Sequence, residues 1–556
     1  MPTTPPSPLV WGEDGLPRSS LYGDVYFSSD DGLAESRAVF LQGCGLPEAW
    51  KGRRRFVVGE LGFGTGLNIA ALLELWRREG PHGAQLHIFS IEAHPLSAEE
   101  ARRALSRWPE VGEAAQALTG RWPGRAWGIH RVELPEFNAI LDLAVMDAAE
   151  ALGGWDGKAD AWFLDGFSPA LNPQMWSEEL LALVAARSRP GARAATFTVA
   201  GAVRRGLEAA GFAVEKRPGF GRKRERLEAR LPGASSEAAV PSVGIVGAGI
   251  AGASLARAFR ALGVEARVHG EADGASRNPA ALVTPRLDAG LGAPARLYSE
   301  SFRRAVALYE PVIARGARQL ETGPRDAARY ATIAGSELFE PGSMTAGDGL
   351  FMADALVVEP EAILRDWLGE LAPIGEVEAD VVCIAAGHRS IEFADVPLQP
   401  IRGQASWAAG VTVDEAVAFG GYAIPMRDGV LFGATHDRDV TDTEVRDEDH
   451  VRNLALLAKG LPELARRLEG EAFQGRASIR AATPDKLPLA GDVGAGRYVL
   501  SGLGSRGFCT APLLAEHVAA RALGAPSPLL VSLEKLVDPR RFAARDNRRP
   551  AAKRGR

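Results

Sequence analysis

Two separate segments in which an apolar strand runs into a glycine-rich loop and then a helix constrain the fold of this chain most strongly. The first begins with the strand residues 56–58 and continues through the loop 59–68, and the second begins with the strand residues 243–246 and continues through the loop 247–252. Glycine lets the backbone turn sharply and approach a ligand closely, and a strand, loop and helix in this order open a nucleotide-binding α/β domain. We therefore expect two different nucleotide-binding domains in one chain.

The order of elements predicts where the domains divide. Residues 232–242 are small and flexible and free of large apolar side chains, which is typical of an interdomain linker. On both sides of the linker, strand-like apolar runs alternate with helix-like stretches, and this order indicates doubly wound parallel sheets of the α/β class. We predict a first domain over 1–231, a second domain over 243–538 and a basic tail over 539–556.

The composition is that of an ordinary globular protein. Of the 556 residues, 46% are hydrophobic and 24% charged, which argues against disordered, fibrous and disulfide-stapled classes. The three cysteines lie far apart without a CxxC pair, so we predict neither a disulfide framework nor a metal site, and a reducing cytoplasm fits best. No apolar stretch is long enough to span a membrane, and the first residues do not read as an export signal.

Acidic residues follow successive strands of the first domain. Glu60 lies at the end of the first strand, Glu92 ends the second strand where a carboxylate suits ribose hydroxyls, and Asp147 follows a later strand where it suits an adenine edge. With the glycine loop, this pattern resembles class I S-adenosylmethionine-dependent methyltransferases, which have a Rossmann-like fold. Glu92 or Asp147 taken singly is also compatible with a helix cap. The predicted cofactor-binding residues are Glu60, Gly62, Gly64, Gly66, Glu92 and Asp147.

Asp165 is the candidate catalytic residue of the first domain. It follows the strand 161–164 and opens the segment 165–170, with Trp176 close behind. In an N-methyltransferase the loop after this strand meets the amine that receives the methyl group. An alkyl amine with a lysine-like pKa is ~99.9% protonated at neutral pH, so the reaction requires a proton acceptor, and Asp165 suits that role. A turn cap before the next helix is the alternative.

The second domain carries a dinucleotide-binding pattern that we assign to FAD. After the strand and the first glycine loop, Glu271 lies 19 residues beyond Gly252, at the end of the next strand, where it suits a ribose. A second glycine loop over 502–507 precedes a helix from about Thr510, and a helix N-terminus suits the negative charge of a reduced flavin. This combination resembles the FAD-dependent D-amino-acid-oxidase-like fold, although a plain turn is an alternative for the second loop. The predicted FAD-binding residues are Gly247, Gly249, Gly252, Glu271, Gly504, Ser505, Arg506 and Gly507.

Several long segments resemble one known family. They are Asp24-Val25-Tyr26-Phe27-Ser28, Gly62-Phe63-Gly64-Thr65-Gly66-Leu67-Asn68, Asp160-Ala161-Trp162-Phe163-Leu164-Asp165-Gly166-Phe167-Ser168-Pro169, Gly219-Phe220-Gly221-Arg222-Lys223-Arg224-Glu225 and Gly502-Leu503-Gly504-Ser505-Arg506-Gly507. In this order they resemble the bifunctional tRNA 5-methylaminomethyl-2-thiouridine biosynthesis proteins, from about Gly12 to about Ala522.

The resemblance implies a two-step maturation of a tRNA wobble uridine with FAD and S-adenosylmethionine. The FAD domain would oxidise the C–N bond of 5-carboxymethylaminomethyl-2-thiouridine and release glyoxylate, and the first domain would methylate the resulting primary amine. The substrate carboxylate requires a cation. Among Arg402, Arg480 and Arg506 we favour Arg480 as a catalytic residue, because the segment 479–485 resembles the part of such oxidases in which an arginine faces the flavin. A structural ion-pair partner is the alternative for each of the three.

A basic run over 216–230 is the candidate surface for the tRNA partner. Within it Arg222, Lys223 and Arg224 form one short segment, and we predict that they contact tRNA phosphates, since such contacts supply most sequence-independent affinity. The Arg-rich tail is the next candidate. A solvated face and a disordered tail are the alternatives for these two runs.

Two other functions stay open on the sequence. One is a fusion of a small-molecule amine methyltransferase with an amino-acid oxidase that never touches RNA. The other is a methyltransferase whose FAD domain is a non-catalytic module that binds tRNA. Whichever of these functions the protein has, we expect it to need no obligate protein partner.

Overall fold

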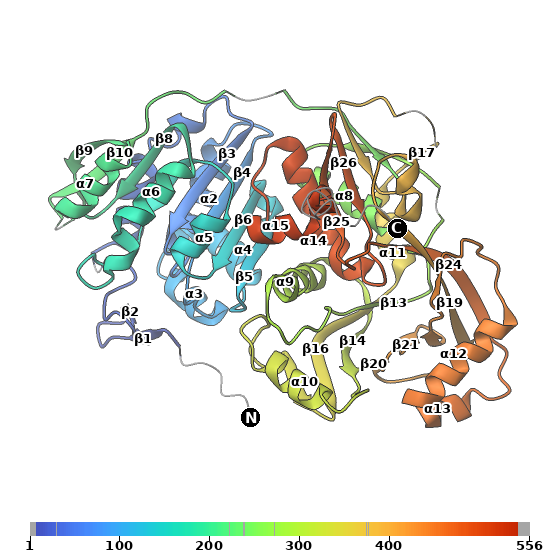
Figure 1. Cartoon of the computed structure of the whole chain (residues 1–556). Coiled ribbons are helices and arrows are strands. Elements are labelled where there is room, and N and C mark those ends of the chain that lie inside the picture. The colour runs from blue at the N-terminus through green and yellow to red at the C-terminus, as the bar shows by residue number, and fades with distance from the viewer. Residues whose placement is uncertain are drawn as a thin grey trace, which may run out of the picture. The chain divides into compact units, whose positions relative to one another are not determined.

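A computed structural model of the chain shows two compact units (Figure 1). The first unit contains the described residues up to Ala239 together with Pro526–Val531, and the second contains Val240–Ala525 and the described residues from Ser532 onward. The described residues are 7–28, 30–221, 223–236, 239–271, 273–373, 375 and 377–542. Most of the basic tail predicted over 539–556 therefore lies outside the described residues.

One eight-stranded sheet, in the order β5-β6-β4-β3-β7-β8-β10-β9, organises the first unit. The pairs β3–β4, β3–β7, β4–β6 and β7–β8 are parallel, and the pairs at the two edges are antiparallel. The strands are β1 (Leu9–Trp11), β2 (Pro17–Ser19), β3 (Arg55–Leu61), β4 (Gln85–Ile91), β5 (Gly128–Leu134), β6 (Ala139–Val145), β7 (Ala159–Leu164), β8 (Ser188–Thr196), β9 (Ala213–Pro218) and β10 (Glu225–Arg230). β1 and β2 form a separate two-stranded sheet.

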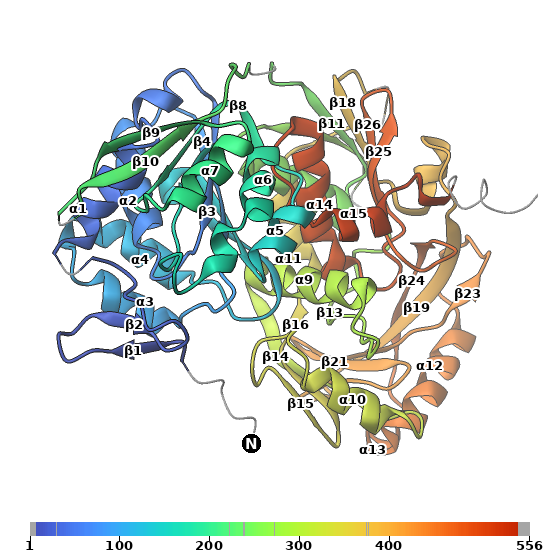
Figure 2. The same ribbon diagram turned by 60° about the vertical axis from the view of Figure 1, so that its left-hand side comes forward.

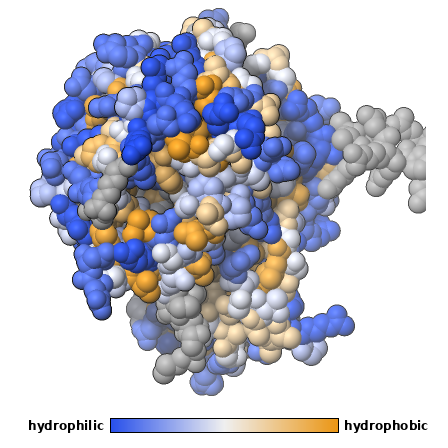
Figure 3. Space-filling view, turned by 90° about the vertical axis from the view of Figure 1, so that its left-hand side faces the viewer, coloured by the Kyte–Doolittle hydropathy of each residue, from blue (hydrophilic) through white to orange (hydrophobic). Residues whose placement is uncertain are grey.

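Two groups of helices accompany this sheet. The helices are α1 (Gly32–Ser36), α2 (Leu67–Glu79), α3 (Ala98–Leu105), α4 (Gly112–Gly120), α5 (Ala148–Gly154), α6 (Glu178–Ala186) and α7 (Gly201–Ala209). α2 contacts α1 and α4, whereas α6 contacts α5 and α7, and Figure 2 shows α5, α6 and α7 together on the side toward the viewer. The face of the protein drawn in Figure 3 is largely hydrophilic, with scattered hydrophobic patches.

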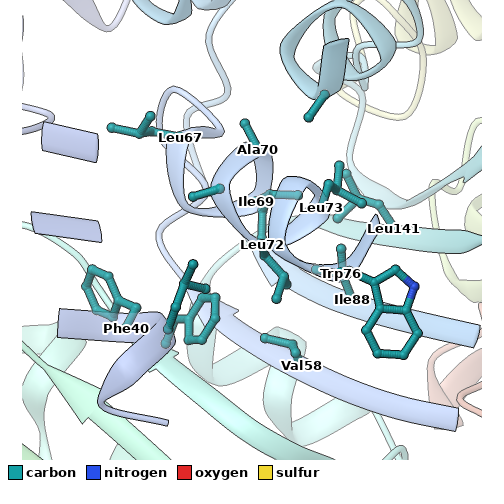
Figure 4. Close-up of a cluster of buried hydrophobic side chains, with 14 of the residues drawn as sticks. Phe40, Val58, Leu67, Ile69, Ala70, Leu72, Leu73, Trp76, Ile88 and Leu141 are labelled. Carbon is teal, nitrogen blue, oxygen red and sulfur yellow. The ribbon is translucent and has the colours of Figure 1, made fainter. Parts of the chain in front are cut away.

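Helix α2 shows how the sequence builds the core of the first unit. Its residues Ile69, Leu72 and Trp76 are buried at the spacing of one helix face. They belong to the same apolar cluster as Val58 of β3 and Ile88 of β4 (Figure 4). This packing fixes the N-terminus of α2, and with it the glycine loop that precedes the helix, at the carboxyl edge of the sheet.

Two sheets organise the second unit. A six-stranded sheet has the order β17-β12-β11-β18-β26-β25, and a ten-stranded sheet has the order β13-β16-β14-β20-β21-β22-β19-β23, with β15 paired to β16 and β24 to β19. The strands are β11 (Val243–Val246), β12 (Ala266–His269), β13 (Ala281–Val283), β14 (Val312–Gln319), β15 (Met344–Gly347), β16 (Gly349–Val358), β17 (Leu371–Ala372), β18 (Val381–Ile384), β19 (Gln399–Ala409), β20 (Ala416–Ala418), β21 (Tyr422–Met426), β22 (Gly429–Gly433), β23 (Asp437–Arg438), β24 (Gln474–Ala482), β25 (Leu489–Gly494) and β26 (Arg497–Ser501).

Helix α14 is the central helix against which two other helices of the second unit pack. The helices are α8 (Ile250–Ala261), α9 (Ala293–Leu308), α10 (Asp326–Ala334), α11 (Pro360–Leu368), α12 (Asp447–Gly460), α13 (Pro462–Arg467), α14 (Gly507–Leu523) and α15 (Val531–Val537). α14 packs against α8 and α9, and its buried Glu516 forms ion pairs with Arg257 at 3.0 Å and Arg304 at 2.6 Å. In the described part of the chain, no helix combines the length and the apolar character that a membrane span requires.

The segment Pro526–Val531 returns to the first unit from far along the chain, and the sequence does not predict it. The Arg131 guanidinium donates a hydrogen bond to the Pro526 carbonyl oxygen at 3.2 Å. Leu530 is 2% exposed, and its side chain would lie 3.0 Å from a Cβ atom added at Gly154 of α5. Apolar packing in the first unit therefore includes residues that follow both sheets of the second unit in sequence.

We expect Leu530→Ala to destabilise the first unit by about 2–4 kcal/mol, because the truncation removes buried apolar contacts. Calorimetry of the full chain measures this effect as a lower midpoint of one thermal unfolding transition. That transition is identified as the one whose midpoint S-adenosylmethionine raises. Leu533→Ala, at a fully buried position of the second unit, is the matched control and should lower the transition that releases flavin. A Leu530→Ala protein in which only the flavin transition falls would assign the segment to the second unit.

Candidate functional site

The glycine loop of the first unit lies between β3 and α2. Gly62, Gly64 and Gly66 have φ angles of +82°, +51° and +77°, which other residue types rarely adopt. A Cβ atom at Gly66 would also lie 3.2 Å from the Trp122 ring. The loop therefore requires glycine.

Two acidic side chains lie next to this loop. Glu92 accepts hydrogen bonds from the backbone N–H groups of Gly64 at 3.0 Å and His94 at 2.9 Å. Glu60 is fully buried, and one of its carboxyl oxygens accepts a hydrogen bond from the Ser90 hydroxyl at 2.5 Å. Its other oxygen has no hydrogen-bond partner among the described residues, and burial raises the pKa of Glu60 well above its usual value. A buried polar atom without a partner favours a ligand group here, and the acidic surroundings fit S-adenosylmethionine with its sulfonium and ammonium groups.

Asp147 caps helix α5. Its Oδ1 atom accepts hydrogen bonds from the backbone N–H groups of Ala149 at 2.8 Å and Glu150 at 3.2 Å, and the residue is exposed. These bonds are those of the helix cap that the sequence left open as an alternative. A contact of Asp147 with adenine stays a prediction.

Asp165 follows β7, the neighbour of β3 in the sheet. Its Oδ1 atom accepts a hydrogen bond from the Gly166 N–H, and its Oδ2 atom accepts one from the Asn68 side-chain amide, both at 2.8 Å. Burial, supported by the negative charge of Glu35, raises the pKa of Asp165 to about 6. At pH 7 the carboxyl group is therefore ionised, yet it is a stronger base than an ordinary aspartate.

Aromatic side chains surround the loop after Asp165. The Phe167 ring centroid lies 5.0 Å from that of Tyr22 and 5.3 Å from that of Tyr26. The Ser168 N–H donates a hydrogen bond to Asp24 at 3.0 Å, which ties the loop to the N-terminal segment. Phe167, Tyr22 and Tyr26 thus form an aromatic wall around the loop after Asp165; Tyr26 belongs to one of the family segments, whereas no sequence motif includes Tyr22.

Ion pairs neutralise much of the basic run over 216–230. The pairs are Lys216–Glu225 at 2.8 Å, Arg217–Glu215 at 2.5 Å and Arg226–Glu228 at 2.7 Å. Such exposed pairs contribute little to stability, but they reduce the positive charge that the run offers to a polyanion.

The three residues predicted to contact tRNA differ in their surroundings. Arg222 lies outside the described residues. The Lys223 ammonium is 2.8 Å from Glu35 and 4.0 Å from the centroid of the Phe197 ring. Arg224 is exposed, and no acidic group among the described residues lies within ion-pair distance of it. Of the two described members of this trio, Arg224 is the one whose charge the structure leaves available.

The glycines in the first glycine loop of the second unit have two different roles: some allow close backbone packing, and one leaves space for a ligand. A Cβ atom at Gly252 would lie 1.8 Å from the Gly247 carbonyl oxygen, and one at Gly247 would lie 2.4 Å from the Ala385 carbonyl oxygen. Gly249 differs, since a Cβ atom there would meet only the Ser276 hydroxyl, at 3.2 Å. Gly249 thus faces the space in which the backbone can approach a pyrophosphate.

The second glycine loop leads into α14. The Gly504 N–H donates a hydrogen bond to the Ala481 carbonyl oxygen at 2.9 Å. The Arg506 guanidinium donates hydrogen bonds to the carbonyl oxygen and the hydroxyl of Thr284, at 3.0 and 2.7 Å, and Ser505 is exposed. Gly507 is the first residue of α14. The predicted helix N-terminus is therefore in place.

A cavity of about 1160 Å³ brings the two loops together. Its volume exceeds that of a pocket for a drug-sized ligand, about 300–1,000 Å³, and therefore fits a dinucleotide such as FAD. Gly252 is absent from the lining, as expected of a packing position. The sequence-predicted residues that line the cavity are Gly247, Gly249, Glu271, Arg480, Gly504, Ser505, Arg506 and Gly507.

Arg480 and Arg402 have opposite environments. Arg480 lines the cavity and donates a hydrogen bond to the Thr435 carbonyl oxygen at 2.9 Å, and no described acidic group lies within ion-pair distance of it. Burial lowers the pKa of Arg480. Arg402 is fully buried outside the cavity lining, with Asp449 at 2.6 Å and Asp442 at 3.2 Å. Arg402 thus has the ion-pair partners of a structural residue, and it does not line the cavity.

Three polar residues at the two sites were not predicted. Tyr422 and His436 line the cavity together with Arg480, but no sequence motif distinguishes either one. Asn68 contacts Asp165 and closes the segment Gly62–Asn68, so the motif that locates the loop offers a signal for it.

We expect Gly249→Asp to give a folded but colourless protein, because the new carboxylate would enter the open space beside Ser276 and repel a pyrophosphate. Flavin absorbance per protein measures the loss, and circular dichroism reports folding. In the matched variant Gly252→Ala, the added Cβ atom would lie 1.8 Å from a backbone oxygen, so the melting temperature itself should fall. A full flavin spectrum in Gly249→Asp would overturn the assignment of this loop.

Comparison with known proteins assigns a reaction class to each unit. A family model described as S-adenosyl-L-methionine-dependent methyltransferase matches residues 109–232, and a family model described as FAD dependent oxidoreductase matches residues 353–521. These matches confirm the two predicted α/β domain classes and the two predicted cofactors.

Three relatives match nearly the whole chain, and each is described as tRNA 5-methylaminomethyl-2-thiouridine biosynthesis bifunctional protein MnmC. The protein of Caulobacter vibrioides is 60% identical, over 98% of this chain and 98% of that protein. The protein of Caulobacter sp. strain K31 is 57% identical over 97% and 98% of the two chains, and that of Maricaulis maris is 42% identical over 98% and 97%. The chain belongs to the MnmC family of bifunctional tRNA 5-methylaminomethyl-2-thiouridine biosynthesis proteins.

Proposed function

We propose that this enzyme converts 5-carboxymethylaminomethyl-2-thiouridine at the tRNA wobble position into 5-methylaminomethyl-2-thiouridine in two steps. The observation that carries the proposal is the complementary chemistry of the two sites. Arg480, a cation without a carboxylate partner among the described residues, lines the FAD-type cavity, and Asp165, a half-buried base, lies in the methyltransferase unit. Arg480 suits a substrate carboxylate, and Asp165 suits an amine.

The oxidative step depends on how the substrate carboxylate is held. FAD, when bound, supplies an acceptor for a hydride. We assign the carboxylate to Arg480, whose guanidinium has further N–H groups beyond the one donated to Thr435. The carbon between carboxylate and nitrogen loses a hydride, and the nitrogen lone pair forms a C=N bond. Water would hydrolyse this imine to glyoxylate and the primary amine, and an external electron acceptor such as dioxygen would have to take up the two electrons that the substrate gives to the cofactor.

Methyl transfer depends on a proton acceptor for the amine. S-adenosylmethionine, when bound, supplies an electrophilic methyl group, and we assign its binding to the loop 62–66 with Glu60, Glu92 and Asp147. The substrate ammonium gives a proton to the Asp165 carboxylate, and the freed lone pair forms the new C–N bond while the C–S bond breaks with its electrons on sulfur. The aromatic wall around Phe167 limits the access of water.

Two observations favour this function over its alternatives. Membership in a family whose members are described as tRNA biosynthesis proteins supports a tRNA substrate rather than a free amine. The position of Arg480 in the cavity wall, without an acidic partner among the described residues, supports an oxidase rather than a passive binding module.

We assign tRNA contacts to Arg222, Lys223 and Arg224. Of the two described residues, Arg224 is the better candidate for a phosphate contact, because it is exposed and lacks an acidic partner among the described residues. Lys223, in contrast, pairs with Glu35. We also propose that the enzyme works in the cytoplasm without an obligate protein partner. Its cysteines are buried free thiols, as suits a reducing compartment.

Mass analysis of wobble nucleosides tests the two steps separately. Asp165→Asn should still release glyoxylate but accumulate the primary amine, with methylation slower on the order of 100-fold.

Only the ionised form of Asp165 accepts a proton, and its pKa is about 6, so wild-type methylation should fall as the pH drops below about 6. Gly249→Asp is the reciprocal control and should methylate a supplied primary amine without releasing glyoxylate. Methylation by Asp165→Asn within twofold of wild type would remove Asp165 from the mechanism, and wild-type enzyme that releases no glyoxylate would contradict the oxidative step.

We expect Arg224→Ala to weaken tRNA binding and to lower the slope of log affinity against log salt by about 0.7, the value for one single-stranded phosphate contact. Arg217→Ala is the matched control, because Glu215 at 2.5 Å already neutralises Arg217, and it should change the slope less. Equal slopes in wild type and Arg224→Ala would place the RNA-binding surface elsewhere.

A further inference from the structure

We propose that Asn68 is a positioning residue for methyl transfer, which holds the Asp165 carboxylate in one orientation. This inference rests on the proposed function, in which Asp165 is the proton acceptor.

A short hydrogen-bond chain links α1, α2 and the strand end at Asp165. The Asn68 Nδ2 atom donates to Asp165 Oδ2 at 2.8 Å, and the Asn68 Oδ1 atom accepts from the Ser36 hydroxyl at 2.8 Å. Asn68 is 9% exposed and Ser36 is 2% exposed. Because solvent barely reaches them, these two bonds decide how the amide is oriented.

The chemistry of the groups permits one orientation of the amide. An ionised carboxylate only accepts hydrogen bonds, so the amide nitrogen must face Asp165. The amide oxygen then faces Ser36, whose hydroxyl donates to it. A reversed amide would place its oxygen against the carboxylate and leave Asp165 Oδ2 without this donor. Ser36 therefore supports the position of Asp165 through Asn68.

The charged groups that act on Asp165 are Glu35 and Lys223, and Asp165 itself acts on Glu60. Glu60 lies on the neighbouring strand β3, and the charge of Asp165 adds to the burial that raises the pKa of Glu60. Glu35 of α1 raises the pKa of Asp165 and Lys223 lowers it, and these two are paired with each other at 2.8 Å. Their effects on Asp165 oppose each other. Asn68 lowers the pKa of both Asp165 and Glu60 without adding a charge.

This position gives Asn68 two consequences for the reaction. A hydrogen bond to the ionised carboxylate favours that form, so Asn68 keeps Asp165 ionised at neutral pH despite its burial. The same bond removes rotational freedom from the carboxylate, and an oriented proton acceptor works faster than a mobile one. Without Asn68 the pKa of Asp165 should rise, and the methylation rate should fall even where Asp165 is ionised.

The test uses the full-length holoenzyme and tRNA that carries the primary amine, with single-turnover methylation measured from about pH 5 to pH 9. In Asn68→Ala we expect the acid limb of the rate profile to move to higher pH by about one unit. We also expect the plateau rate to fall on the order of 10-fold. Glyoxylate release in the other unit should stay at the wild-type level.

Ser36→Ala is the matched variant, because it removes the support of the amide but leaves the donor to Asp165. It should lower the plateau rate less than Asn68→Ala and move the acid limb less. Because both residues act on Asp165 through one chain, the double variant should be no slower than Asn68→Ala alone.

The outcomes separate this inference from the proposed function. An unchanged acid limb in Asn68→Ala, with Asp165→Asn impaired, would overturn the role of Asn68 and leave Asp165 as the base. Unimpaired methylation by Asp165→Asn would overturn the base itself. If Asn68→Ala does not bind S-adenosylmethionine or does not fold, Ser36→Ala becomes the test of the inference. A wild-type plateau rate in Ser36→Ala would then overturn it.

Discussion

The crowding of carboxyl groups at one edge of the first sheet is the constraint on which the methyltransferase site depends. Glu60 and Asp165 lie at the ends of the neighbouring strands β3 and β7, and Glu92 follows β4 on the other side of β3. Closely spaced carboxylates cannot all be ionised in a buried site. Burial raises the pKa of Glu60 well above its usual value, whereas Asp165, with a pKa of about 6, is ionised at neutral pH. Glu92 instead accepts two backbone hydrogen bonds. The three carboxyl groups can therefore perform three different tasks.

The FAD-type unit has the opposite electrostatic arrangement. Its cavity keeps Arg480 without a described acidic partner. Arg402, on the paired strand β19 and next to the residue opposite Arg480, is fully buried with Asp449 and Asp442. A buried charge requires a partner, and a cation that lines a cavity can take that partner from a substrate. The difference between these two arginines thus separates a residue that stabilises the fold from one that suits an anionic ligand.

Strand order made much of both sites predictable from the sequence. Parallel strands end at the same edge of a sheet, so acids that directly follow successive strands, such as Glu92 and Asp165, are expected near one glycine loop. Contacts between distant segments were not predictable. Asn68 and Asp165 are 97 positions apart, and the pairing of Lys223 with Glu35 and the burial of Arg402 depend on how loops and strands pack in three dimensions. Periodicity and spacing carry no information about such contacts.

The return of Pro526–Val531 to the first unit affects how this chain can be divided. Proteolysis or gene fission where the chain passes from Ala239 of the first unit to Val240 of the second would leave these residues on the C-terminal fragment. The N-terminal fragment would then expose the apolar surface next to Gly154 that Leu530 covers in the intact chain. Exposed apolar surface of this kind promotes association. A free-standing methyltransferase derived from this chain would therefore need polar residues at that surface or a short extension of its own to cover it.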